Sequence, residues 1–182
     1  MTVTPTEIIT FWFSDAVKKQ WFAATPTLDE KILAHYATVW EQAAQHALDH
    51  WCATPEGSLA LVIVLDQFPL NMFRHQAHSF STEQQALAVA NQAIARQQDQ
   101  QLTPDQQIFL YMPFMHSENL ADQDRAVALC RAANLVETTQ FAEHHRAIIQ
   151  TYGRFPHRNA ILSRESSAAE LAYLASDEAF KG

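Results

Sequence analysis

The chain has 182 residues, two cysteines and a formal net charge of -8, with a pI near 5.5. This acidic balance argues against a broad nucleic-acid interface, which needs Lys and Arg clustered over a whole face. Its three glycines, Gly57, Gly153 and Gly182, are too scattered for a phosphate-cradling loop, so nucleotide sites of the Walker and Rossmann types are excluded. Cys52 and Cys130 show neither a CxxC nor a His-spaced pattern, so we expect reduced cysteines, no metal site and no cofactor.

The length of the chain is most simply that of a single domain, here residues 1–182. No apolar stretch approaches the roughly 18 residues of a membrane helix. A basic-then-apolar leader and a lipidation motif are also not found. We therefore expect a soluble, cytoplasmic protein that contacts neither membrane nor nucleic acid.

The first part of the chain carries aromatic residues at helical positions. Thr4 precedes a proline in a helix-capping arrangement, and a helix rich in Phe and Trp follows. Behind a capping box that starts at Thr27, apolar residues recur every three or four positions as far as Trp51, which predicts one long helix. We expect the aromatic rings, including Trp21 and Phe22, to bury apolar area in the core.

The most apolar run in the sequence, residues 59–65, has no polar side chain at all. Such a run predicts a central helix that is enclosed on every side. Asp66 follows at what should still be buried depth, so we expect it to be paired with an arginine, either Arg74 or one from residues 154–164. Pro69 is expected to end the helix.

Helix signals continue through the second half of the chain. An aromatic-rich helix is predicted to run up to Pro113. Another spans roughly residues 137–152 and places Phe141 and His145 on its apolar face. A capping box at Ser167 opens a last short helix.

Strand signals are missing, because β-branched residues are few and alternation of apolar and polar residues does not persist. The fold class predicted is therefore all-α. About eight helices joined by short loops should pair as antiparallel hairpins and stack like a few units of an α-α superhelix.

Positive charge is concentrated near the end of the chain. Residues 144–164 hold four arginines and no Asp or Glu, whereas residues 32–73 contain no Lys or Arg. A cationic segment in an acidic chain has either acidic partners elsewhere in the fold or an anionic ligand. Polar residues gather at three corners broken by proline, residues 66–74, 111–123 and 154–165. These corners are either ion-paired parts of the fold or the lining of one ligand pocket.

The segments LDQFPLNMFR, YMPFMHSENLADQ and GRFPHRNAILSRES together resemble the domain-of-unknown-function family numbered 924, and the likeness runs over nearly the whole chain. The resemblance implies an all-helical fold similar to the tetratricopeptide-like superfamily, and it implies no established activity. Leu70 stands where the family commonly has arginine, so position 70 is not taken as a site residue.

The first functional hypothesis is that the corners bind a small anionic ligand, a phosphate or carboxylate. Arg74, Arg158 and Arg164 would bind it, because arginine forks suit such groups, with His157 and Asn159 as hydrogen-bonding neighbours. The full set expected at the site is Asp66, Arg74, His116, Glu118, Arg154, His157, Arg158, Asn159 and Arg164.

Two other hypotheses stay open at this point. His116 and Glu118 are the candidates for acid–base catalysis of a hydrolytic reaction, although residues two positions apart diverge on a regular helix. The alternative from a different class is a tetratricopeptide-like scaffold that binds a peptide or protein without any chemistry. An enclosed charged pocket would favour a ligand or a reaction, and an open groove would favour the scaffold.

Overall fold

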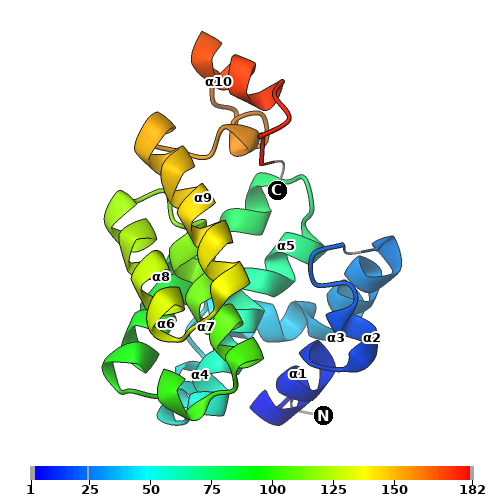
Figure 1. The fold of residues 1–182 in the computed structure, drawn as a ribbon. Helices are drawn as coiled ribbons and strands as arrows, with labels where there is room; N and C mark the ends of the chain where they lie inside the picture. The colour runs from blue at the N-terminus through cyan, green and yellow to red at the C-terminus, as the bar shows by residue number, and fades with distance from the viewer. Residues whose placement is uncertain (1–2, 24, 181–182) are drawn as a thin grey trace. The chain divides into compact units, whose positions relative to one another are not determined.

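The computed structural model describes residues 3–23 and 25–180, and every regular element in that part of the chain is a helix, as predicted (Figure 1). The α-helices are α1 (Pro5–Trp12), α2 (Asp15–Lys18), α3 (Pro26–Ala44), α4 (Pro55–Val62), α5 (Phe68–Met72), α6 (Glu83–Ala95), α7 (Pro104–His116), α8 (Leu120–Ala132), α9 (Val136–Tyr152) and α10 (Ala168–Leu174). Shorter 3-10 turns are η1 (Asp49–Ala53), η3 (Ala77–Phe80), η4 (Asp99–Gln101) and η5 (Pro156–Arg158), and η2 (Ile63–Gln67) is a π-helical turn.

The close contacts of the chain divide it into two compact units. Unit 1 comprises Met1–Arg74 and His78–Pro113, and unit 2 comprises His75–Ala77 and Phe114–Gly182. The single domain over residues 1–182 stays a prediction, and each unit is described by itself. No helix in residues 3–23 and 25–180 is both long enough and apolar enough to cross a membrane.

Unit 1 is built around the predicted central helix. Residues 59–65 are at most 2% exposed, because α4 packs against α1 and α6 while η2 packs against α3 and α6. Thr54 caps α4 as predicted, and its hydroxyl accepts a hydrogen bond from the N–H of Gly57 at 3.1 Å. Position 57 requires glycine, because a Cβ there would lie 2.0 Å from the carbonyl oxygen of Trp51.

Pro69 does not end this helix, so that prediction is wrong. The chain continues helical through η2 and α5 as far as Met72. In the π turn the N–H of Phe68 donates to the carbonyl of Ile63, one residue further back than in an α-helix. The wider turn accommodates a residue that has no N–H to donate. Pro113 likewise lies inside α7 rather than at its end.

The long helix predicted from Thr27 to Trp51 is shorter in the structure. Its N-cap is Thr25, and α3 ends at Ala44. His46 adopts a left-handed φ of 63°, and the N–H of Ala47 donates to the carbonyl of Gln42, which closes the helix. The next helical element is the 3-10 turn η1.

Most of the N-terminal aromatic rings pack in unit 1 as predicted. Trp12 is 1% exposed and makes edge contacts with Phe68 and Phe109, with ring centroids 5.8 and 5.5 Å away. Trp21 lies 4.6 Å from the same Phe109 ring. Phe22 is the exception, because it is 80% exposed and contributes little to the core.

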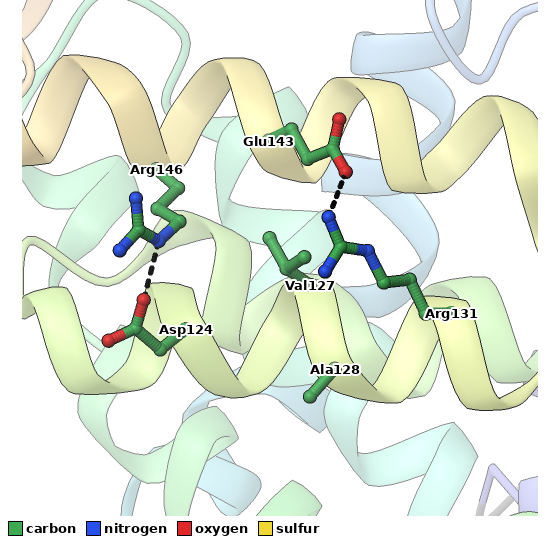
Figure 2. Close-up of a pocket in the computed structure, with 6 residues that line it drawn as sticks. All are labelled: Asp124, Val127, Ala128, Arg131, Glu143 and Arg146. Atoms are coloured by element: carbon green, nitrogen blue, oxygen red, sulfur yellow. Dashed lines mark hydrogen bonds and ion pairs between the residues drawn. The ribbon is translucent and has the colours of Figure 1, made fainter.

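Unit 2 contains the helical hairpin formed by α8 and α9. Asp124 pairs with Arg146 and Arg131 pairs with Glu143, an order that requires the two helices to run antiparallel (Figure 2). This hairpin agrees with the predicted pairing of neighbouring helices, and the stacking of such pairs into a tetratricopeptide-like superhelix stays a prediction. His145 is buried on α9 as predicted, whereas Phe141, one turn before it, is 61% exposed and is not buried with it.

Candidate functional site

The structure places the nine predicted site residues in different units. Asp66 and Arg74 belong to unit 1. The other seven, His116, Glu118, Arg154, His157, Arg158, Asn159 and Arg164, belong to unit 2. We therefore describe the site from unit 2 alone.

Asp66 lies in η2 and is buried, as predicted. One of its carboxylate oxygens accepts a hydrogen bond from the Gln67 amide at 2.5 Å. Arg74 instead forms a two-point contact with Asp29, at 2.7 and 2.9 Å, and donates to the amide oxygen of Asn71. The first arginine that we expected to pair with Asp66 is thus held by another carboxylate, and pairing with an arginine of residues 154–164 stays a prediction.

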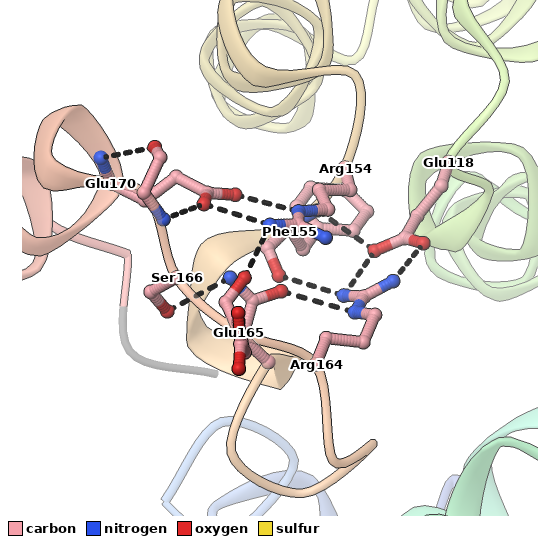
Figure 3. Close-up of polar contacts among 9 residues, drawn as sticks. Glu118, Arg154, Phe155, Arg164, Glu165, Ser166 and Glu170 are labelled. Atoms are coloured by element: carbon pink, nitrogen blue, oxygen red, sulfur yellow. Dashed lines mark hydrogen bonds and ion pairs between the residues drawn. The ribbon is translucent and has the colours of Figure 1, made fainter.

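The remaining residues are positioned by the turn that follows α9. Gly153 takes a left-handed φ of 71° and ends the helix, after which η5 and the following turn bend the chain back toward α10. Ser167 caps α10 through a capping box with Glu170, as the sequence predicts. We call residues 154–164, together with Glu118 and Glu170, the arginine corner (Figure 3).

Glu118 joins two parts of this corner. Its carboxylate accepts hydrogen bonds from both terminal nitrogens of Arg164, at 2.7 and 2.9 Å. It also accepts one from the backbone N–H of Phe155 at 2.8 Å. Burial opposes ionisation of Glu118, but the hydrogen bonds from Arg164 and Phe155 outweigh it and hold the pKa below its ordinary value. The corner therefore contains a half-buried carboxylate that is ionised at neutral pH.

A second ion pair lies at the start of the last helix. Arg154 donates to both carboxylate oxygens of Glu170, at 2.7 and 2.8 Å, and to the backbone carbonyl of Glu165 (Figure 3). Hydrogen bonds from Arg154 and from the backbone of Ser167 hold the pKa of Glu170 well below its usual range. Glu170 is 3% exposed and has two roles, since it both caps α10 and neutralises Arg154.

Arg158 and Asn159 fill the middle of the corner. Arg158 is 6% exposed, and its guanidinium carbon lies 4.8 Å from the centre of the Phe155 ring. The amide of Asn159 donates to the hydroxyl of Ser166 at 3.0 Å and accepts from Nε of Arg164 at the same distance. The ring of Phe155 thus contacts the guanidinium group of Arg158, while its backbone N–H donates to Glu118 and its carbonyl accepts from Arg164.

Two imidazoles lie beside the same ring, one of them buried (His145) and the other partly buried (His157). His145 and His157 each have ring centroids 5.6 Å from that of Phe155. Burial, together with the neighbouring charge of Arg158, lowers the pKa of each to about 4. Nδ1 of His145 faces the carbonyl of Phe141 at 2.8 Å and must carry the proton. Nδ1 of His157 is buried without a hydrogen-bond partner in the described part of the chain.

The geometry does not favour acid–base chemistry by the pair His116 and Glu118. Both carboxylate oxygens of Glu118 are engaged by Arg164, and a carboxylate with a lowered pKa is a poor proton carrier near neutral pH. His116 lies close enough to influence His145 and His157, since its charge lowers the pKa of both. Within residues 3–23 and 25–180, no group of three His, Cys, Asp or Glu is arranged to hold a metal ion.

Two depressions mark the surface of unit 2. One, of about 370 Å³, lies between α8 and α9, where the ion pairs Asp124–Arg146 and Arg131–Glu143 flank Val127 (Figure 2). The other, of about 490 Å³, is lined by Arg154, Glu170 and neighbouring residues of α9 and α10. The second depression opens beside the arginine corner and gives solvent a route to Arg154.

Three residues of this region were not predicted as site residues. Glu170 had a visible role as a capping residue, but nothing in its spacing connects it with Arg154. His145 could have been found, because its place on the apolar face of α9 already marks it as a buried imidazole. Phe180, whose ring contacts both imidazoles, carries no signal in the sequence.

Comparison with known proteins identifies relatives without a known activity. A family model described as a bacterial protein of unknown function (DUF924) matches residues 8–178. The solved structure of a protein of unknown function from Agrobacterium tumefaciens is 38% identical in sequence, with a TM-score of 0.89, over 94% of this chain and 96% of that chain. No curated protein matches. The fold is therefore shared with these proteins, and no reaction is transferred with it.

Proposed function

The chain belongs to this bacterial family of unknown function, so its function has to be argued from the site, and we propose that the arginine corner of unit 2 binds a small anionic molecule. The ligand carries a phosphate or carboxylate group. One observation carries the proposal: three guanidinium groups come from a single short segment, and two of them, those of Arg158 and Arg164, contact the same residue, Phe155. Such a concentration of arginine forks is the usual means of binding planar or tetrahedral oxyanions.

The internal carboxylates indicate how such a ligand would be held. Glu118 forms a two-point contact with Arg164, and Glu170 forms one with Arg154. The side chains of Arg154 and Arg164 are still 31% and 23% exposed, so an anion from solvent can reach them. An incoming oxyanion would share or replace these contacts, and its net affinity is the difference between the two sets of ion pairs.

The test is a thermal-shift series with phosphate, sulfate, citrate and nucleotides, each compared with chloride at matched ionic strength. At about a hundred times its dissociation constant, a ligand should stabilise the protein by roughly 2.7 kcal/mol. We expect Arg154→Ala and Arg158→Ala to lose this response. Arg74→Ala is the matched control, because it removes the same charge from unit 1 and should keep the response.

Equal responses from the wild type and from both variants of the corner would refute the proposal. The arginines would then serve the fold through Glu118 and Glu170. In that case the scaffold that binds a peptide or protein would become the leading hypothesis.

A further inference from the structure

Phe180, in the segment after α10, packs against the imidazoles of His145 and His157. Its ring centroid lies 4.4 Å from that of His145 and 5.0 Å from that of His157, with both contacts edge-on. Phe155 forms a third wall, since its ring lies 5.6 Å from each imidazole. We call the place that the Phe180 ring occupies against His145, His157 and Phe155 the aromatic slot. It is a site of the shape and polarity that accept a flat apolar ring.

Few contacts fix Phe180 in place. Its N–H donates to the Tyr173 hydroxyl at 2.9 Å, and its ring is only partly buried against the cluster formed by Ile148, Ile149 and Phe155. Residues 175–180 lie beyond the last helix and are tied back by single turn contacts. A segment with so few contacts opens at a small fraction of the cost of unfolding the unit.

The slot adjoins the arginine corner through shared residues. The Phe155 ring contacts both the His157 ring of the slot and the guanidinium group of Arg158, and His157 directly precedes Arg158 in the chain. Nδ1 of His157 is buried and has no hydrogen-bond partner among the described residues. An unsatisfied buried nitrogen costs free energy, and a hydrogen bond from a ligand group would remove that cost. A ring in the slot would therefore contact His157 and Phe155, and the guanidinium group of Arg158 contacts the same Phe155 ring.

We propose that the aromatic slot is the ring-binding part of the anion site, so that the ligand is an aromatic anion and Phe180 is the intramolecular group that fills the slot in its absence. This inference rests on the proposed function and names its ligand class, a flat ring joined to a phosphate or carboxylate. The acidic residues Asp177 and Glu178 just before Phe180 give the segment the same chemistry, an aromatic ring beside negative charge. Phe180 and the ligand compete, so removing the phenyl ring raises affinity.

The first experiment measures binding of phenyl phosphate and of inorganic phosphate by calorimetry. If Phe180 fills the slot 90–99% of the time, Phe180→Ala should tighten phenyl phosphate binding by roughly 10- to 100-fold. Inorganic phosphate has no ring and should bind the variant and the wild type equally. Leu171→Ala is the control, because Leu171 is an exposed apolar residue of α10, and both affinities should stay unchanged.

A second measurement uses the wild-type chain and does not depend on how well the variant folds. Saturating phenyl phosphate should release Phe180, so that the NMR order parameter of its backbone amide falls from the rigid range near 0.85 to below about 0.6. Inorganic phosphate should leave this order parameter unchanged.

The outcomes separate this inference from the proposed function. If inorganic phosphate binds but phenyl phosphate binds no tighter to Phe180→Ala than to the wild type, Phe180 is only a core residue and the inference fails alone. A Phe180 amide that stays rigid under saturating phenyl phosphate overturns the inference even if the variant does not fold. If neither phosphate binds the wild type or the variant, the proposed function fails and this inference fails with it.

Discussion

The apolar run of unit 1 and the Phe155 region of unit 2 bury different kinds of groups. In unit 1 the centre is the apolar run of residues 59–65, enclosed by helices and followed by the stacked ring of Phe68. In unit 2 the Phe155 region has only a small apolar cluster and is completed by ion pairs, a buried Arg158 and two neutral imidazoles. Unit 1 should therefore be sensitive to lost volume, and unit 2 should be sensitive to charge and pH.

The largest effect is expected from Phe68→Ala in unit 1. Phe68 is fully buried, with its ring stacked on Tyr36 at 4.9 Å and in contact with Trp12. Truncation should reduce the free energy of unfolding by about 3–5 kcal/mol, because it leaves a cavity that rigid neighbours cannot fill. Urea denaturation measures this loss. Phe68→Leu keeps much of the volume and should cost clearly less; equal losses would mean that packing does not dominate unit 1.

The next largest effect is a pH dependence that arises in unit 2. The pKa of both His145 and His157 is lowered from 6.5 to about 4 in the folded chain. Between pH 6.5 and pH 4 the unfolded chain therefore binds protons that the folded chain does not, so the free energy of unfolding falls as the pH is lowered through this window. The loss should be on the order of 3 kcal/mol for each histidine. Below about pH 4.5, protonation of Glu118 and Glu170, whose pKa values are lowered in the folded chain, should add a further loss.

Urea denaturation at several pH values from 7 to 4 checks this prediction. The charges that act on the two imidazoles are those of Arg158, His116, His144 and Glu118, together with that of His145 on His157. Only the charge of Glu118 opposes the lowered pKa of His157. His145→Gln should flatten the pH dependence by about half. His50→Gln replaces an exposed histidine of unit 1 and should leave the pH dependence as in the wild type. If both variants follow the wild-type curve, the imidazoles of His145 and His157 do not control the stability of unit 2.

The features that could be predicted from the sequence are those with local causes. The caps at Thr54 and Ser167 depend on residues within three positions, and the enclosure of residues 59–65 follows from their composition. The break at His46 was missed because a left-handed histidine carries no strong signal, unlike a glycine. Pro69 was misread because a π turn depends on how the surrounding helices pack.

The candidate site was predicted in its residue types but not in its pairings. Glu118 and Arg164 were both named, yet they lie 46 positions apart, and only the folded chain brings their side chains together. The partner of Arg154 was missed for the same reason, since Glu170 was read only as a cap. The contact of Phe180 with two imidazoles depends on the path of the chain after α10, which no periodic pattern encodes.

A smaller effect is expected when the central ion pair of unit 2 is broken. Arg164→Ala leaves the half-buried carboxylate of Glu118 with the single remaining hydrogen bond from Phe155 and should cost about 2 kcal/mol. Glu118→Gln keeps a hydrogen-bond acceptor for Phe155 and should cost less. The double variant completes a cycle, and we expect a coupling energy of roughly 1–2 kcal/mol. Strictly additive losses would show that the two-point contact contributes nothing of its own.

The smallest effect is expected at Arg131 and Glu143, a pair that connects α8 and α9 (Figure 2). Their side chains are 65% and 46% exposed, so water screens both charges and the flexible side chains lose entropy when they pair. Arg131→Ala should cost about 0.2–1 kcal/mol, and most of that difference should vanish in 1 M salt. The pair is the matched comparison for Glu118 and Arg164, because each joins an arginine to a glutamate from another segment of unit 2. If Arg131→Ala cost as much as Arg164→Ala, burial would not be what separates the arginine corner from an ordinary surface ion pair.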